Sequence, residues 1–78
     1  MKGARIVKHS VSIAGHQTSI SLEEVFWNAL RQQAEERGIP LRVLIAEIDS
    51  GRDEQNLSSA IRVHILNALQ EKLEARTG

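Results

Sequence analysis

The chain has 78 residues, of which 41% are hydrophobic, 26% are charged and none is cysteine. This composition excludes disulfide-stapled folds and thiolate metal sites, and its apolar fraction is that of a single globular domain. No apolar stretch approaches the ~20 residues of a membrane-spanning helix. No signal-like apolar segment follows the first basic residues, so we expect a cytoplasmic protein without membrane contact. Because so short a chain buries only roughly 60% of its surface, we also expect a homodimer.

The zero net charge hides an uneven distribution. Residues 1–22 contain Lys2, Arg5 and Lys8 and no acid, which gives +3, whereas residues 23–78 contain seven bases and ten acids, which gives −3. Such a split favours a basic arm, residues 1–8, that faces a polyanion, in front of one domain over 9–78. A merely solvated basic tail is the alternative interpretation.

Strand patterning covers residues 9–21. Apolar residues or Thr alternate with polar ones at Val11 and Ile13, and again at Thr18 and Ile20. Between them Gly15 can supply the positive φ of a tight turn. Two arrangements remain open: a hairpin of strands at about 9–13 and 17–21, or a flexible arm followed by one strand. In a hairpin, residues 10, 12, 17, 19 and 21 would share one polar face.

A first helix is predicted over residues 22–37. Ser21 and Glu24 have the spacing of a capping box, and the first turn is acidic, as the helix dipole favours. Gly38 is typical of a residue that ends a helix. The buried stripe predicted for this helix consists of Leu22, Phe26, Ala29, Leu30 and Ala34, with Trp27 at its side.

Two further helices follow. Pro40 suits the first turn of a helix over 40–50, and Asn56 suits the N-cap of a helix over 57–75. Their apolar stripes are Leu41, Leu44, Ile45 and Ile48 in the second helix, and Leu57, Ile61, Ile65, Ala68, Leu69 and Leu73 in the third. The sequence therefore predicts an α+β domain that is mostly helical.

The predicted elements follow in the order basic strand, helix, glycine-containing turn and second helix. This order resembles the ribbon-helix-helix superfamily of Arc, MetJ and CopG type. The resemblance is carried by TSISLEEVFWNALRQQAEERGIPLRVLIAEI and covers about residues 8–70. GHQTSISLEEVFW and NLSSAIRV are similar to a short bacterial ribbon-helix-helix subgroup. The third helix is an addition to the minimal fold.

The resemblance implies an intertwined dimer in which two chains pair their strands and present a two-stranded ribbon to the DNA major groove. It implies base contacts by Gln17, Ser19 and Ser21. It places a phosphate contact at the start of the second helix, near Arg42, although Pro40 replaces the usual Ser or Thr cap there. The acid-free basic arm predicts further phosphate contacts by Lys2, Arg5 and Lys8. A four-stranded dimer sheet would be wide for a groove of ~12 Å. The implied core and dimer residues are Thr18, Ile20, Leu22, Phe26, Trp27, Leu30, Leu44, Ile45 and Ile48.

Other chemistry has little support. His9, His16 and His64 lack the spacing of metal ligands, so we expect no metal or cofactor. No serine has a general base and an orienting group near it in the sequence, so we do not expect an enzyme. For Arg62 we expect an ion pair with Asp49 or Asp53. The predicted function is a transcriptional regulator that binds double-stranded DNA. The alternative is a protein-interaction module, an antitoxin or adaptor, that holds a protein partner through helix 57–75.

Overall fold

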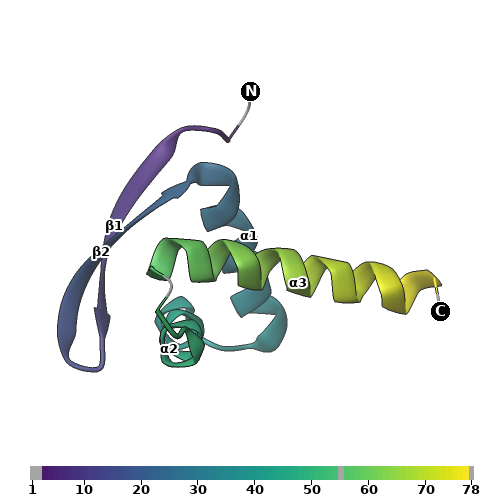
Figure 1. Ribbon diagram of the computed structural model, residues 1–78. Helices are drawn as coiled ribbons and strands as arrows, with labels where there is room; N and C mark the ends of the chain where they lie inside the picture. Colours follow the sequence, from purple (N-terminus) through teal and green to yellow (C-terminus); the bar gives the residue numbers. More distant parts are fainter. Residues whose placement is uncertain (1–2, 55, 78) are drawn as a thin grey trace.

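The computed structural model describes residues 3–54 and 56–77. Strands β1 (Ile6–Ile13) and β2 (His16–Glu23) form an antiparallel hairpin. Three helices follow: α1 (Glu24–Arg37), α2 (Leu41–Gly51) and α3 (Leu57–Thr77). Figure 1 shows all three helices on one side of the hairpin. The predicted α+β class with an added third helix is confirmed, and the hairpin, not the flexible arm, is the arrangement observed.

The hairpin closes through a two-residue turn. Ala14 and Gly15 have φ values of 51° and 82°, and two positive values in succession define a type I′ turn, whose twist matches that of paired strands. The register runs from Ile13 opposite His16 to Ile6 opposite Glu23. β1 thus begins three residues earlier than predicted, and Lys8 belongs to the strand.

The start of α1 differs from the prediction. β2 continues to Glu23, and Glu23 is an N-cap without a side-chain cap hydrogen bond, so the expected capping box between Ser21 and Glu24 is wrong. The segment before β1 replaces it. The Glu24 N–H donates to the Arg5 carbonyl over 2.8 Å, and the Val25 N–H donates to the Gly3 carbonyl over 3.0 Å. Backbone carbonyls therefore satisfy amides that a side chain was expected to satisfy.

The other helix ends follow local rules. Gly38 adopts a left-handed φ of 69° and ends α1, as predicted. Pro40 has an extended backbone and is the N-cap of α2, so this helix begins at Leu41. Asn56 accepts a hydrogen bond from the Ser59 N–H over 2.8 Å, which confirms the predicted cap of α3.

The core lies between the inner face of the hairpin and the three helices. Trp27 is buried, donates from Nε1 to the Val7 carbonyl over 2.8 Å, and meets the His9 ring edge to face at 4.6 Å. Phe26 is only half-buried and packs against the edge of the core, so Trp27, which was predicted to flank the buried stripe, is the more deeply buried of the two. The most deeply buried side chains are Trp27, Ile20, Leu22, Leu30, Leu44, Ile45, Ile61 and Ile65.

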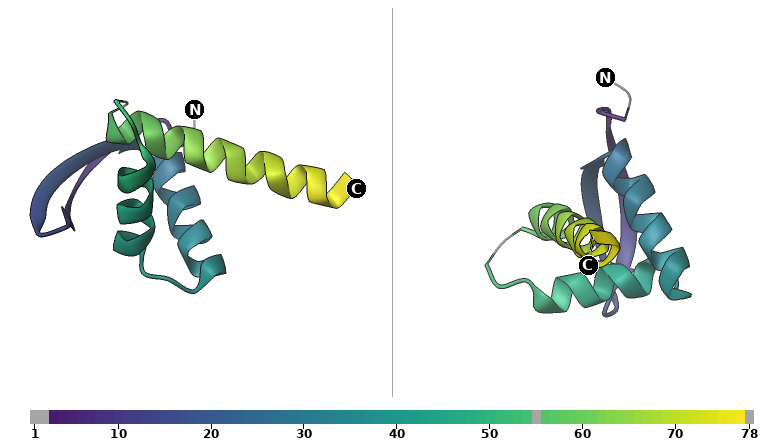
Figure 2. Two further views of the ribbon diagram at one scale, coloured as in Figure 1. Left: turned by 60° about the horizontal axis from the view of Figure 1, so that its bottom comes forward. Right: turned by 90° about the vertical axis from the view of Figure 1, so that its right-hand side faces the viewer.

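α3 has two unlike halves. Ile61 and Ile65 are buried, whereas Leu69 and Leu73 are exposed, so the predicted stripe is correct only in the first half. Figure 2 shows the second half extending beyond α1 and α2. No helix in the described ranges is both long and apolar enough to cross a membrane.

Candidate nucleic-acid interface

One face of the hairpin is polar and lies away from the helices. Because directly paired residues of antiparallel strands point to the same side, Lys8 lies beside Ser21, Ser10 beside Ser19, and Ser12 beside Gln17. Figure 1 shows no described helix on this side of the strands. We call it the outer face; its exposed residues are Ile6, Lys8, Ser10, Ser12, Gln17, Ser19 and Ser21.

The outer face carries hydrogen-bonding groups and little negative charge. Serine hydroxyls donate and accept, and the Gln17 amide does both, which suits base edges and phosphate oxygens. Neighbouring strands lie about 4.8 Å apart, so two strands fit a groove about 12 Å wide. Ser10 and Ser12 belong to this face because β1 folds back. The sequence alone left that fold-back open.

The acid at the end of the outer face is neutralised. Glu23 is the one acidic residue within the two strands, and its carboxylate lies 2.9 Å from the Arg62 guanidinium, which also stacks over Phe26 at 5.7 Å. A hydrogen bond from its own backbone N–H and then the bond from Arg62 lower the pKa of the Glu23 carboxyl. The expected pairing of Arg62 with Asp49 or Asp53 is wrong.

Three of the predicted phosphate-binding cations are exposed and form no ion pair with another described residue. Ion pairs among the described residues occupy Arg37, Arg52, Arg62 and Lys72, but not Arg5, Lys8 or Arg42. Lys8 is on the outer face and Arg5 directly precedes β1. Arg42 is in the first turn of α2, on the helix side, so the structure does not bring it to the outer face. Lys2 lies outside the described residues.

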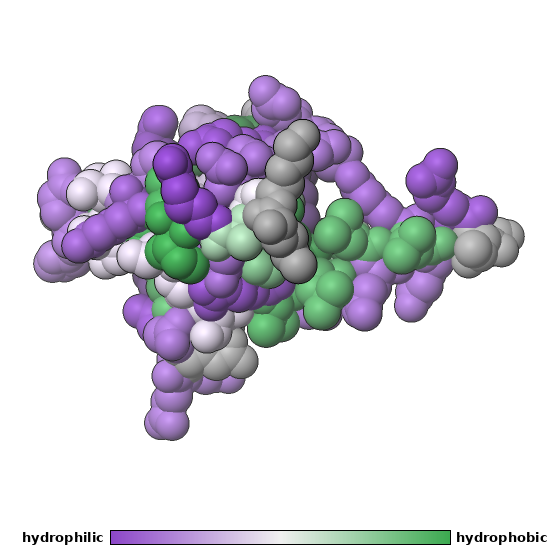
Figure 3. All heavy atoms as spheres, turned by 90° about the horizontal axis from the view of Figure 1, so that it is seen from above, coloured by the Kyte–Doolittle hydropathy of each residue, from purple (hydrophilic) through white to green (hydrophobic). Residues whose placement is uncertain are grey.

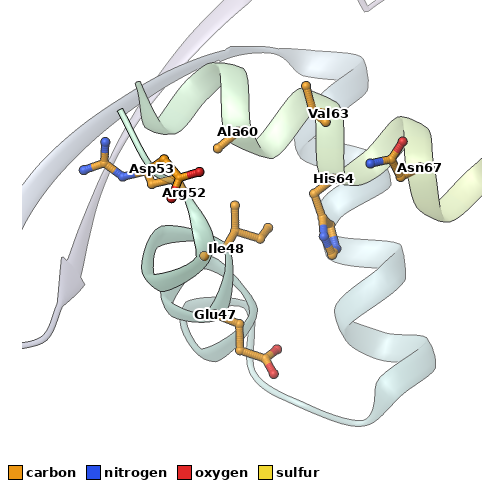
Figure 4. A pocket seen from close by; sticks show the side chains of 9 residues that line it. Glu47, Ile48, Arg52, Asp53, Ala60, Val63, His64 and Asn67 are labelled. Carbon is orange, nitrogen blue, oxygen red and sulfur yellow. The ribbon is translucent and has the colours of Figure 1, made fainter. Parts of the chain in front are cut away.

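A groove between α2 and α3 is a weaker candidate. Figure 4 shows Ile48 and His64 facing the same space, whose volume is about 340 Å³. Its carboxylate Glu47 already accepts two hydrogen bonds from Arg37, at 2.8 and 3.1 Å, and this hydrogen bonding lowers the pKa of the Glu47 carboxyl. Across residues 3–54 and 56–77, no three His, Cys, Asp or Glu side chains gather as metal ligands would.

A known family matches the part of the chain that forms the hairpin and the helices behind it. A family model described as a ribbon-helix-helix domain matches residues 6–69, from the start of β1 into α3. The chain belongs to the ribbon-helix-helix domain family. This confirms the resemblance noted in the sequence, and the ribbon-helix-helix family suggests a DNA-binding or regulatory role. In this structure both strands of the ribbon come from one chain, whereas the resemblance implied pairing between two chains.

One solved structure is similar over nearly the whole chain. It is described as an uncharacterized protein from Bordetella pertussis Tohama I, with 26% sequence identity and a TM-score of 0.81. The match covers 96% of this ribbon-helix-helix chain and spans 64% of the length of that one. The comparison with curated proteins gives no match.

Proposed function

We propose that this ribbon-helix-helix chain is a dimeric transcriptional regulator of the bacterial cytoplasm that binds double-stranded DNA through the outer face. The observation that supports this most directly is an exposed two-stranded face that carries a lysine and whose one carboxylate is paired with Arg62. The family suggests a DNA-binding or regulatory role, and the major groove admits a two-stranded ribbon.

Each group has a role in this proposal. Gln17 can form two hydrogen bonds with adenine, and Ser19 and Ser21 can donate to or accept from several base edges. Arg5 and Lys8 contact phosphates beside the groove. Arg42 contacts a phosphate from the helix side, and Lys2 adds to the positive charge of the N-terminal segment. No catalytic step or cofactor is part of this function.

A salt titration tests the proposal. Binding of the chain to a labelled duplex should weaken steeply with salt, and Lys8→Ala should lower the slope of log K against log salt by about 0.9, the value for one phosphate contact. The matched control is Arg31→Ala, which removes an exposed cation from α1 that, within the described part of the chain, bonds Asn28. It should leave the slope unchanged. Equal slopes for both variants would count against the outer face.

Base contacts make a separate prediction. Gln17→Ala should reduce discrimination between preferred and random duplexes by about 1–3 kcal/mol while leaving the salt slope intact. Gln32→Ala, an exposed glutamine on α1, is the control and should change neither. A Gln17→Ala variant with full sequence discrimination would remove Gln17 from the set of base-contacting residues.

A second function, a protein-interaction module, is favoured by the exposed leucines of α3. Leu66, Leu69 and Leu73 are 55%, 46% and 61% exposed. This function would be preferred if the folded chain binds no duplex at about 50 mM salt, where phosphate contacts are strong, and loses a protein partner on truncation after Leu66.

A further inference from the structure

A second groove lies between α1 and the second half of α3. Its volume is about 520 Å³, and small-molecule sites in proteins have volumes of roughly 300–1,000 Å³. We call it the α1–α3 groove; α1 contributes Gln33, Glu36 and Arg37 to it, and α3 contributes residues between His64 and Ala75. His64, which Figure 4 shows at the groove between α2 and α3, lines both grooves, so the two adjoin.

Small side chains of α3 leave this space open. Ala68, Glu71 and Ala75 recur at intervals of four and three residues, which places them on one face of the helix, toward α1. Because the two alanines fill little volume, they form an apolar floor. The exposed leucines of α3 lie on another face, since neighbours such as Ala68 and Leu69 differ by about 100° on a helix. Figure 3 shows hydrophobic residues gathered along this projecting helix. A molecule in the groove therefore leaves the leucines uncovered.

Gln33 is a buried polar side chain without a partner. It is only 8% exposed, and no described residue accepts a hydrogen bond from its Nε2. Buried polar groups are nearly always hydrogen-bonded, because a donor left without an acceptor destabilises the fold. Gln33 lines the groove, and the last torsion of a glutamine side chain is soft, so its N–H groups can turn toward an acceptor there. An oxygen atom of a ligand would satisfy this donor.

The charges that line the groove leave one carboxylate unpaired. Lys72 donates to both carboxylate oxygens of Glu36, over 2.7 and 2.6 Å, and Arg37 is bound to Glu47 of α2. Glu71 is exposed and belongs to no ion pair among the described residues. Two other charged residues of this half of α3 do not line the groove: Glu74 and Arg76. The groove therefore favours a cation over an anion.

We propose that the α1–α3 groove binds a small organic cation that also carries a carbonyl oxygen. The carbonyl accepts a hydrogen bond from Gln33, the ammonium group pairs with Glu71, and the apolar body lies on Ala68 and Ala75. The ligand connects α1 to residues 66–76, where no side chain is buried and where a helix is marginal in water without packing. This site goes beyond the proposed function, and it is tested without DNA.

An amide chemical-shift titration with phenylalanine amide tests the site, because this probe has an ammonium group, a carbonyl and an apolar ring. The side-chain N–H signals of Gln33 should move, with a dissociation constant of about 1 mM, as is typical of so small a ligand. Phenethylamine, which lacks the carbonyl, should bind about fivefold more weakly. N-acetylphenylalanine amide, which lacks the cation, should bind about threefold more weakly. No binding of phenylalanine amide at about 10 mM, or equal binding of all three probes, would overturn the proposal.

Two variants with matched controls test the proposed contacts. Gln33→Leu should weaken binding of phenylalanine amide about fivefold without lowering the urea midpoint, because the amide has no partner in the free chain. Glu71→Gln changes an exposed residue, so the chain stays folded, and binding should weaken about threefold. The controls Gln32→Leu and Glu35→Gln alter exposed residues of α1 that do not line the groove and should leave binding unchanged. Full affinity in either Gln33→Leu or Glu71→Gln contradicts the site.

Amide hydrogen exchange locates the bound probe. With phenylalanine amide at tenfold its dissociation constant, exchange over residues 66–76 should slow by about tenfold, because opening of this half of α3 releases the ligand. Unchanged exchange over these residues would mean that the probe does not lie between α1 and α3, and the proposal would be wrong.

Discussion

Glu23 joins three elements of the ribbon-helix-helix chain. It is the last residue of β2 and the N-cap of α1, and its carboxylate binds Arg62 of α3. Because its pKa in the folded chain is below the ordinary value, the ionised carboxylate favours folding. This contribution is fully present above the pKa of the unfolded chain, and it is lost as the pH falls through the lower pKa of the folded chain.

Glu23→Gln should therefore flatten the acid side of the stability profile. Below about pH 4.5 the unmodified chain loses the Glu23 contribution, whereas the variant has no such group to protonate. Urea denaturation from neutral pH to about pH 3 measures the difference. Glu71→Gln, which alters an exposed glutamate in the middle of α3, is the control and should follow the unmodified chain. Identical acid profiles for Glu23→Gln and the unmodified chain would contradict this role.

Ala14 is a residue in an unfavourable conformation. Its φ of 51° is left-handed, which costs an ordinary L-residue roughly 1–2 kcal/mol and costs Asn less. Ala14→Asn creates the Asn-Gly pair that type I′ turns prefer and should stabilise the chain by about 1 kcal/mol. Gly15→Ala should destabilise it, because Gly15 has φ 82° although a Cβ there would meet no atom within 4 Å. Urea midpoints that move in the opposite directions would contradict a type I′ turn.

At the scale of elements, the features that depend on nearby residues were predicted correctly, and those that depend on contacts between distant segments were not. The predicted end of α1 at Gly38 and the predicted N-cap of α3 at Asn56 are correct, because a helix end depends on residues within one turn. The start of α1 is wrong because carbonyls of Gly3 and Arg5 come from another segment. The turn at Ala14 was ambiguous because alanine is rare at positive φ.

The same distinction applies to the candidate site. Strict alternation predicts that Gln17, Ser19 and Ser21 point outward, and the structure exposes all three. The pairing of Arg62 with Glu23 joins residues 39 apart, and no local pattern could indicate it. Neighbouring Phe26 and Trp27 differ by about 100° on the helix, so the periodicity of α1 alone could not decide which one the hairpin buries.

The packing between elements depends on side chains such as that of Leu30, a completely buried residue of α1. Leu30→Ala should destabilise the chain by about 2–5 kcal/mol, because the removed atoms leave a cavity. Val43→Ala, at an exposed position, should cost less than about 0.5 kcal/mol. Urea unfolding at several protein concentrations measures both. A Leu30→Ala variant as stable as Val43→Ala would mean that α1 does not pack against the core as described.

At the scale of the whole molecule, the hairpin and the helices lie on different sides. The hairpin lies on one side of the molecule, the helices lie behind it, and the second half of α3 extends from the body (Figures 1 and 2). With ten basic and ten acidic residues the net charge is zero, so the proposed attraction to DNA depends on where the unpaired cations lie and not on their total. Arg5 and Lys8, at the hairpin, meet that condition.

The most direct measurement is an amide chemical-shift map of the chain as a double-stranded DNA duplex is added. Because the hairpin is proposed to enter the groove, the largest shifts should fall on Lys8, Ser10, Ser12, Gln17, Ser19 and Ser21, and they should fade as salt is raised. The amides of the second half of α3 should not respond. An absence of shifts at about 50 mM salt, where phosphate contacts are strong, would contradict DNA binding. Shifts confined to the helices would contradict binding through the outer face.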